Sequence, residues 1–446
     1  MKRFLSILAV LLLLAIVGVG IFLATFDADR YRPVVVQRMG EALGRPVKLE
    51  RISLRWKNGI AAELQGLEIS PDLQVGSVNV LLQPLPLLRG DIQIGAVSIR
   101  GLRAHLIRGA GGEIEVPGLL PLPAASAPAA PAPGGPAAKA APLLIRDFRI
   151  EEGTIRYTDQ STRPPLDLTL ERVSVRAVLD LPAEQLEIKE CSANLAQGTA
   201  RLSGVVRKFN TLPEGDLSFR MENVRLEAVA PPDAGQAGLQ GALGAAMEIR
   251  FQGQPASDLL KGLSASGQVS ILEGRLSNVN LLRQVFDQMT VIPGLTDSLL
   301  ARLPPSYSQK LTEQDTSLQP LNLSFTLQNG AVSFREFRVA TDSFELAGSG
   351  QVGLDGGLGL SAQIFIQPEL SAAFIRSVEE LRFLADDSQR IVLPVRLSGT
   401  IQKPAVSPDL QAFTQKLFSN KAQDLVGDLL NRVLEKKKKK EDPSDG

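Results

Sequence analysis

The chain has 446 residues, of which 44% are hydrophobic and 22% are charged, and its 48 basic residues are balanced by 48 acidic ones. This length allows more than one domain, and this hydrophobic content allows a buried core. The charge balance excludes the usual nucleic-acid-binding protein, because phosphate neutralisation needs a basic face. The single cysteine, Cys191, can form no internal disulfide and is typical of a small buried apolar side chain.

Residues 4–26 form an uncharged apolar run directly after Lys2 and Arg3. At ~1.5 Å per helical residue this run reaches about 34 Å, enough to cross a hydrocarbon core. Two acidic residues follow it, so the order of charges predicts a cytoplasmic tip at residues 1–3 and places the rest of the chain on the other side of the membrane. A cleaved signal peptide is the alternative, but its apolar core is usually about 7 to 15 residues long and ends at small residues. We therefore expect an uncleaved, single-pass membrane anchor.

Changes in composition divide the rest of the chain. An Ala/Pro-rich linker or loop at 121–142 separates an N-terminal β region at 27–120 from a longer β region at 143–408. An amphipathic helix is expected at 409–435, before a charged, disordered tail at 436–446. Because acidic residues share the polar face of this helix, a cap on the end of the sheet is favoured over a membrane-binding or partner-binding helix.

Alternation with a period of two is the strongest pattern of the β regions, and it predicts strands with one apolar and one polar face. It is clear in two runs, Leu321, Leu323, Phe325 and Leu327, and Leu393, Val395 and Leu397.

Three short segments indicate hairpin turns. A two-residue turn at Asn329-Gly330 pairs Leu327 with Val332 and then Phe325 with Phe334. Glu152-Gly153 and Glu273-Gly274 predict the same arrangement for three further pairs, Ile150 with Ile155, Phe148 with Tyr157, and Ile271 with Leu276. Each turn places apolar residues together on one face.

Few helices are expected beyond these strands. The segment 29–43 suits a short helix that ends at Gly44, and 280–303 suits one or two short helices interrupted at Pro293.

Motifs of catalysis and metal binding are missing from the sequence. His105 is the only histidine, which excludes a site built on two histidines and leaves one candidate base for a serine triad. The segment 348–353 matches GxGxxG, but a further turn follows it where a nucleotide-binding fold needs a helix. We therefore expect no enzyme activity, no cofactor and no metal.

Several segments together resemble the AsmA-like family of Gram-negative bacteria. They are the apolar run followed by 29–33 and 43–47, the strand-acidic-Gly-strand unit at 148–157, and the C-terminal segments 344–350 and 393–400 with Pro404. The resemblance covers most of the chain outside 121–142, although the chain is shorter than the largest members of the family.

The resemblance implies an inner-membrane-anchored periplasmic β-groove, related to bridge-like lipid transfer proteins, that carries acyl chains on its apolar face. The sequence agrees physically, because so few helices cannot cover the apolar face of so many strands. The fold expected is mainly β, with a long curled antiparallel-rich sheet behind a transmembrane helix. The candidates for the groove lining are Leu321, Leu323, Phe325, Leu327, Val332, Phe334, Phe344, Leu346, Leu393, Val395 and Leu397.

The function expected from this groove is binding of phospholipid or another acyl lipid and its transfer or buffering between the inner and outer membranes. An outer-membrane or periplasmic protein partner is possible, and nucleic acid is not. The alternative is a closed, dry sheet that acts as a scaffold or assembly factor in outer-membrane biogenesis.

Overall fold

The computed structural model describes residues 27–44, 46–56, 60–70, 72–83, 94–109, 114–115, 144–161, 165–209, 211–231, 238–253, 262–288, 294–401, 403–409 and 411. Lys2, Arg3, the expected anchor at 4–26, the linker at 121–142 and all but the first residues of the expected C-terminal helix and tail lie outside these ranges. The described part is mainly β with few, short helices. Within it, no helix combines the length and the apolar character needed to cross a membrane.

Two compact units make up the chain. Unit 1 consists of Met1–Val224 and Ala246–Ser264, and unit 2 consists of Arg225–Ala245 and Ala265–Gly446. Strand β11 (Gly238–Gln252) contributes residues to both.

Unit 1 begins with the short 3-10 helix η1 (Ala28–Tyr31) and helix α2 (Arg32–Leu43). Gly44 ends α2 in the left-handed conformation, with φ of 65°, as the sequence predicts. The strands that follow are β1 (Arg51–Trp56), β2 (Ile60–Ser70), β3 (Leu73–Leu82), β4 (Ile94–Arg108), β5 (Ile114–Glu115), β6 (Leu144–Asp159), β7 (Leu166–Asp180), β8 (Gln185–Leu195), β9 (Gly198–Arg207) and β10 (Glu214–Arg225).

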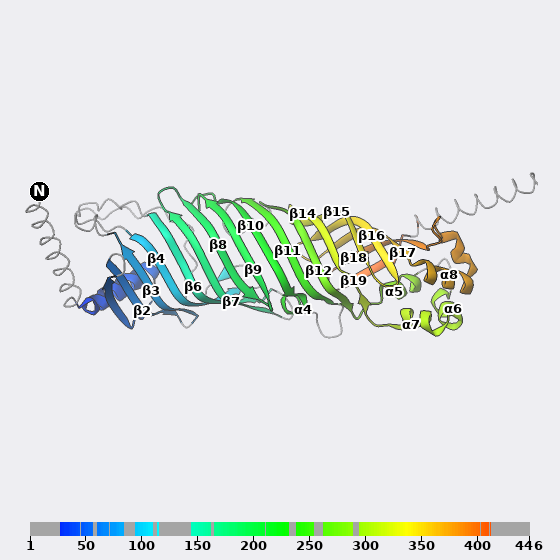
Figure 1. Ribbon diagram of the computed structural model, residues 1–446, viewed down its shortest axis with the longest axis horizontal. Coiled ribbons are helices and arrows are strands. Elements are labelled where there is room, and N and C mark those ends of the chain that lie inside the picture. The colour runs from blue at the N-terminus through cyan, green and yellow to red at the C-terminus, as the bar shows by residue number, and fades with distance from the viewer. Residues whose placement is uncertain are drawn as a thin grey trace, which may run out of the picture. The chain divides into compact units, whose positions relative to one another are not determined.

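These strands pair in the order β1-β2-β3-β4-β6-β7-β8-β9-β10, and β4, β6, β8, β9 and β10 run side by side in Figure 1. Every pair is antiparallel except β4 with β6, which is parallel. A small core forms where α2 packs on the first strands, and its buried members are Ala28, Val47, Leu49, Ile52, Leu67 and Val75.

The prediction of a hairpin turn at Glu152-Gly153 is wrong, because strand β6 continues through these residues. Glu152 has φ of 57°, and the register with β7 shifts between Ile150 and Gly153, which marks a β-bulge. Both edges of β6 are paired here, one with β7 and the other with β4, so the strand cannot fold back on itself. The residues expected to face each other pair with β7 instead, Phe148 with Ala177, Ile150 with Val175, Ile155 with Leu170 and Tyr157 with Leu168.

Similar bulge positions recur at nearly the same level of neighbouring strands. Gly66 of β2, Gly101 of β4 and Arg172 of β7 have φ of 62°, 65° and 49°, and the strand registers place them close to the level of Glu152. Bulges bend a strand and increase its twist, so this row curls the sheet of unit 1.

Unit 2 continues with β12 (Leu263–Ser277), β13 (Thr316–Ser317), β14 (Leu321–Gln328), β15 (Ala331–Ala340), β16 (Phe344–Gly353), β17 (Leu358–Ile366), β18 (Val392–Gly399) and β19 (Pro404–Pro408). Its helices are α4 (Leu226–Val229), α5 (Leu281–Asp287), α6 (Leu295–Arg302), α7 (Pro305–Thr312), α8 (Pro368–Ser377) and the 3-10 helix η2 (Glu379–Leu384). The strands are antiparallel in the order β12-β14-β15-β16-β17-β18-β19. In the described residues β1 has a ladder only with β2 and β19 only with β18, so the sheet is not closed.

The hairpin at Asn329-Gly330 has the predicted geometry. The two residues have φ of 53° and 74°, and Leu327 pairs with Val332. The ladder ends one step later, before Phe325 and Phe334.

The prediction of a hairpin turn at Glu273-Gly274 is also wrong, because strand β12 continues through these residues, with φ of 53° at Glu273. Ile271 pairs with Leu321 and Leu276 with Thr316. This strand is held on the far side of the bulge by β13, so a local turn has no room to form.

Helices cover the apolar face of the last strands of unit 2. Side chains from α5, α6, α7, α8 and η2 form one buried cluster with β16, β17 and β18, and Figure 1 shows α5 to α8 gathered near β17. At its centre the rings of Phe286 and Phe374 meet edge to face, with centroids 5.3 Å apart. This part of unit 2 is therefore a conventional dry core.

Candidate functional site

An apolar row crosses five strands of unit 1 on one face of the sheet. The strand registers place five residues side by side, Ile150, Val175, Cys191, Leu202 and Phe219, one from each of β6 to β10. Residues that face each other across a ladder point to the same side, so these five share a face. A second row beside it consists of Phe148, Ala177, Ile188, Gly204 and Leu217. We call the two rows together the apolar face of unit 1.

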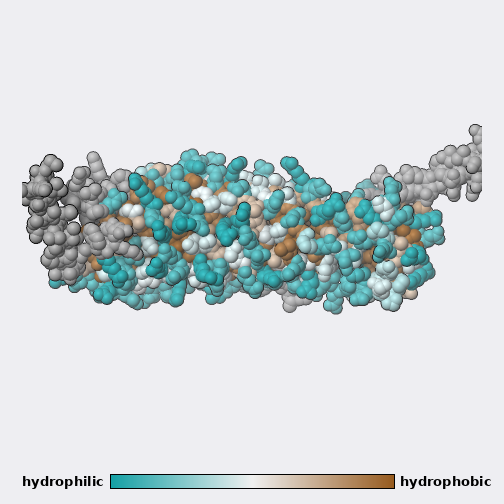
Figure 2. All heavy atoms as spheres, in the orientation of Figure 1, coloured by the Kyte–Doolittle hydropathy of each residue, from teal (hydrophilic) through white to brown (hydrophobic). Residues whose placement is uncertain are grey.

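Most side chains of this face are only half-buried. All five residues of the first row are of intermediate exposure, and none of them belongs to either buried cluster. The opposite face of the same strands is polar and exposed, as the neighbours Ser218 and Arg220 of Phe219 show. In the view of Figure 2 hydrophilic residues predominate on the surface, with hydrophobic ones between them. The described part of unit 1 thus contains no second layer that covers this face.

Cys191 lies in the middle of the first row, between Val175 and Leu202. Burial raises the pKa of its thiol. The cysteine is therefore protonated at neutral pH and behaves as a small apolar side chain. As the single thiol of the chain, it can be labelled selectively.

The lining residues expected from the sequence all lie in unit 2, and the structure divides them by burial. Phe344, Leu346, Leu393 and Val395 are members of the helix-covered cluster, and Leu393 and Val395 are 1% and 2% exposed. Leu321 and Leu327 are also buried. The half-buried residues are Leu323, Phe325, Val332, Phe334 and Leu397, three of which pack against the cluster from its edge.

Val395 belongs to this closed core and is 2% exposed. A carboxylate there would lie in a closed core, so it would report on folding and not on an open groove. The apolar face of unit 1, which the sequence pattern did not single out, is half-buried instead.

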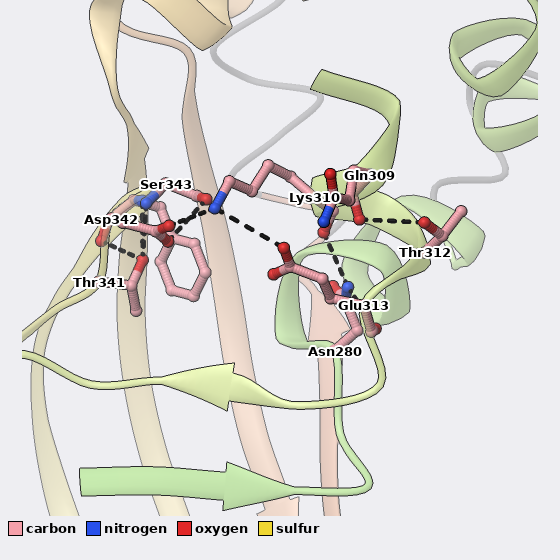
Figure 3. A network of polar contacts seen from close by, with 9 residues as sticks. Asn280, Gln309, Lys310, Thr312, Glu313, Thr341, Asp342 and Ser343 are labelled. Atoms are coloured by element: carbon pink, nitrogen blue, oxygen red, sulfur yellow. Dashed lines mark hydrogen bonds and ion pairs between the residues drawn. The ribbon is translucent and has the colours of Figure 1, made fainter. Parts of the chain in front are cut away.

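A polar network joins α5 and α7 to the β15–β16 turn in unit 2 (Figure 3). Lys310 forms ion pairs with Asp342 and with Glu313, the latter at 3.7 Å from Nζ to Oε1. Asn280 caps α5 by accepting a hydrogen bond from the Arg283 N–H at 2.9 Å. Its amide nitrogen also donates to the carbonyls of Lys310 and Glu313 at 2.8 and 2.9 Å.

The electrostatics of this network are balanced. The hydrogen bond with Asp342 raises the pKa of Lys310, and the same contact lowers the pKa of Asp342. A cavity of about 380 Å³ opens beside the network, lined by further paired groups such as Arg275 and Asp315. Because its charges are paired within the protein, the network has the structural role of connecting the helices to the sheet.

His105 lies between two polar side chains at one end of β4. Its Nδ1 is 3.3 Å from Asp72 Oδ1 and its Nε2 is 2.9 Å from Thr158 Oγ1. This order of carboxylate, imidazole and hydroxyl resembles a catalytic triad, but a triad also needs oxyanion donors beside a substrate cavity. The contacts link β3, β4 and β6, which is a structural role. Among the described residues no group of three or more His, Cys, Asp or Glu side chains is placed to hold a metal ion.

Comparison with known proteins gives one match, at the level of the family. The model of the AsmA family matches residues 1–176. No curated protein matches the chain. No solved structure matches it either. This match covers the expected anchor and the strands β1 to β6 with the first part of β7, and it supports the AsmA-like resemblance for this part of the chain.

Proposed function

We propose that this protein is a lipid-handling protein of the bacterial envelope, anchored in the inner membrane, with the bulk of the chain in the periplasm. The AsmA family match over residues 1–176 and the large open sheet fit an envelope role at the level of the family. The proposal goes further, to binding of acyl chains on the apolar face of unit 1 and transfer or buffering of phospholipid between the two membranes.

The half-buried apolar row of β6 to β10 supports this proposal most directly. Among the described residues no layer covers the apolar side chains of these five adjacent strands, which leaves a contiguous hydrophobic strip of a kind that soluble proteins rarely expose without a ligand. An acyl chain laid on the strip gains about 0.8 kcal/mol for each methylene removed from water. No directional bonds hold it there, so it can slide along the strip while its head group stays in water.

Labelling of the single cysteine tests this binding. Cys191 of the full chain should react with a maleimide slowly when vesicles of phosphatidylethanolamine and phosphatidylglycerol supply lipid, and faster after lipid is extracted. The matched control is Lys189→Cys in a Cys191→Ser background, because Lys189 is exposed and two residues away on β8. Equal protection of both positions, or of neither, would contradict acyl-chain binding on this face.

A scaffold in outer-membrane biogenesis is the second candidate, and one observation favours it. The end of unit 2 is a closed core of helices on strands, with Leu299, Leu381 and Ile391 fully buried. Such a cap offers a rigid surface and no room for lipid. A rate of Cys191 labelling that is the same with and without lipid would favour this role.

A further inference from the structure

Strands β14 and β15 separate after their hairpin, and the segment just before β14 meets the end of β15 again. Their ladder runs from Gln328 and Ala331 only to Thr326 and Ser333. At the far end the N–H of Gln319 donates to the carbonyl of Ala340 at 2.8 Å. The strands are thus joined at both ends of a segment about 20 Å long in which no ladder pair forms between them.

A bulge in β15 accompanies this gap. The register of β15 with β16 shifts between Phe334 and Phe337, so β15 carries an extra residue there. A cavity of about 550 Å³ lies between the two strands at this level. We call this cavity the β14–β15 window.

The lining of the window changes from polar to apolar through the thickness of the sheet. Exposed residues supply the outer rim, among them Ser324, Arg335 and Glu336. The inner part is lined by Leu323 and Phe325, which are half-buried, and by Phe337, which belongs to the buried cluster; the other lining residues are Asn322, Thr326, Ser333 and Arg338.

Two cations at the rim differ in their pairing. Arg338 forms an ion pair with Glu345. Arg335 has no ion pair with any residue that the structure describes, although Glu336 follows it in the sequence. A free guanidinium beside an apolar opening is the arrangement that suits a phosphate ester of a lipid, because guanidinium binds phosphate oxygens through two parallel hydrogen bonds.

We infer that the β14–β15 window is a lateral portal for phospholipid, in which the acyl chains pass between the strands while the phosphate stays at Arg335. This inference rests on the proposed function and adds an entry and exit site to it. The helix-covered cluster supports a portal at this place, because Leu393 and Val395, at 1% and 2% exposure, lie in a closed core beneath the helices. A lipid that occupies the inner side of β14 must leave before it reaches that core.

A β-strand from a partner protein is the other occupant that unpaired strand edges attract. The closed ends argue against it. A strand added to β14 would have to run past Thr326 or past Gln319, where the two strands are already joined.

Photo-crosslinking tests the portal. The full chain is reconstituted with vesicles of phosphatidylethanolamine and phosphatidylglycerol, and p-benzoylphenylalanine is placed at one position at a time. Ser324 reports on the rim, and Phe219 on the apolar face of unit 1. Ser361 is the control, because it is exposed on β17, away from the window.

Phospholipid adducts are expected at Ser324 and Phe219 but not at Ser361. Arg335→Glu should lower the yield at Ser324 by about tenfold, the size of effect expected for a charge-assisted contact that becomes repulsive. Arg376→Glu, a charge reversal on the exposed side of α8, should leave the yield unchanged.

Each other outcome has a definite meaning. Adducts at Phe219 without adducts at Ser324 would overturn the portal and leave the proposed function intact. Protein adducts at Ser324 would overturn it in favour of a partner strand. If Arg335→Glu leaves the yield of lipid adduct at Ser324 unchanged, the role of the guanidinium is overturned. If no position gives a lipid adduct, the proposed function itself is overturned.

Discussion

Two valine-to-aspartate changes should have opposite consequences for the fold and for lipid binding. Val395 is 2% exposed in the helix-covered cluster of unit 2, whereas Val175 is half-buried in the apolar row of unit 1. Val395→Asp forfeits the burial of a full valine side chain, about 1.5 to 3 kcal/mol, and places a carboxylate in an apolar core. The sum should exceed ~4 kcal/mol, a large part of the stability of a domain.

At Val175 the carboxylate can reach water, so Val175→Asp should cost only about 1 kcal/mol. The loss there should appear in bound phospholipid, because a charge interrupts the apolar row. Since the chain has two units, each is followed separately by limited proteolysis in increasing urea, with fragments assigned by mass spectrometry. Arg396→Asp is the outward control for Val395, since it breaks an exposed ion pair with Asp409 and should cost under about 1 kcal/mol. Equal destabilisation by the two valine changes would refute the distinction between a closed core and an open face.

Three further predictions concern local features. Gly330→Val should destabilise unit 2 by about 2 kcal/mol, because a β-branched residue resists φ of 74°, whereas Gln328→Val in the adjacent strand should be tolerated; equal urea midpoints would contradict this. Asn280→Ala should lower the free energy of unfolding by about 2 kcal/mol, because it removes the α5 cap and two hydrogen bonds to carbonyls. Asn280→Asp should recover part of this loss by restoring the cap, so identical urea midpoints for the two variants would argue against the cap. The pKa of Asp342 is lowered by Lys310, so its contribution to stability is present above the unfolded pKa and disappears as the pH falls through the folded one; Asp342→Asn should therefore flatten the acid side of the stability profile, and an unchanged profile in urea titrations at pH 2 to 7 would exclude the contact.

Turn prediction from sequence succeeds or fails here according to the neighbours of each strand. Asn329 and Glu152 both adopt positive φ before a glycine. At Asn329 the chain turns back and the residues on its two sides pair with each other, which makes a hairpin. At Glu152 the strand continues as a bulge, because β4 and β7 are paired with the two edges of β6. The same backbone preference thus serves two structures, and only the pairing of distant strands decides between them.

The apolar surface was predictable in kind but not in place. Alternation identifies the strands and their two faces, yet it does not say which apolar face another layer covers. Helix α8, with Pro368 at its start and Leu370 and Phe374 at helical spacing, carries a helix signal that the strand pattern around it obscures. Helix α8 joins Leu393 and Val395 in one buried cluster, so a strand that was predicted from alternation lies in a closed core. The open row around Cys191 emerges only from the registers of five strands.

Photo-crosslinking in living cells at two adjacent positions of β10 tests the central claim most directly. Phe219 points to the apolar face and Arg220 to the exposed polar face, so p-benzoylphenylalanine at these positions samples the two sides of one strand. Acyl-chain binding predicts phospholipid adducts at Phe219 and none at Arg220. Absence of lipid at Phe219, or equal adducts at both positions, would contradict it.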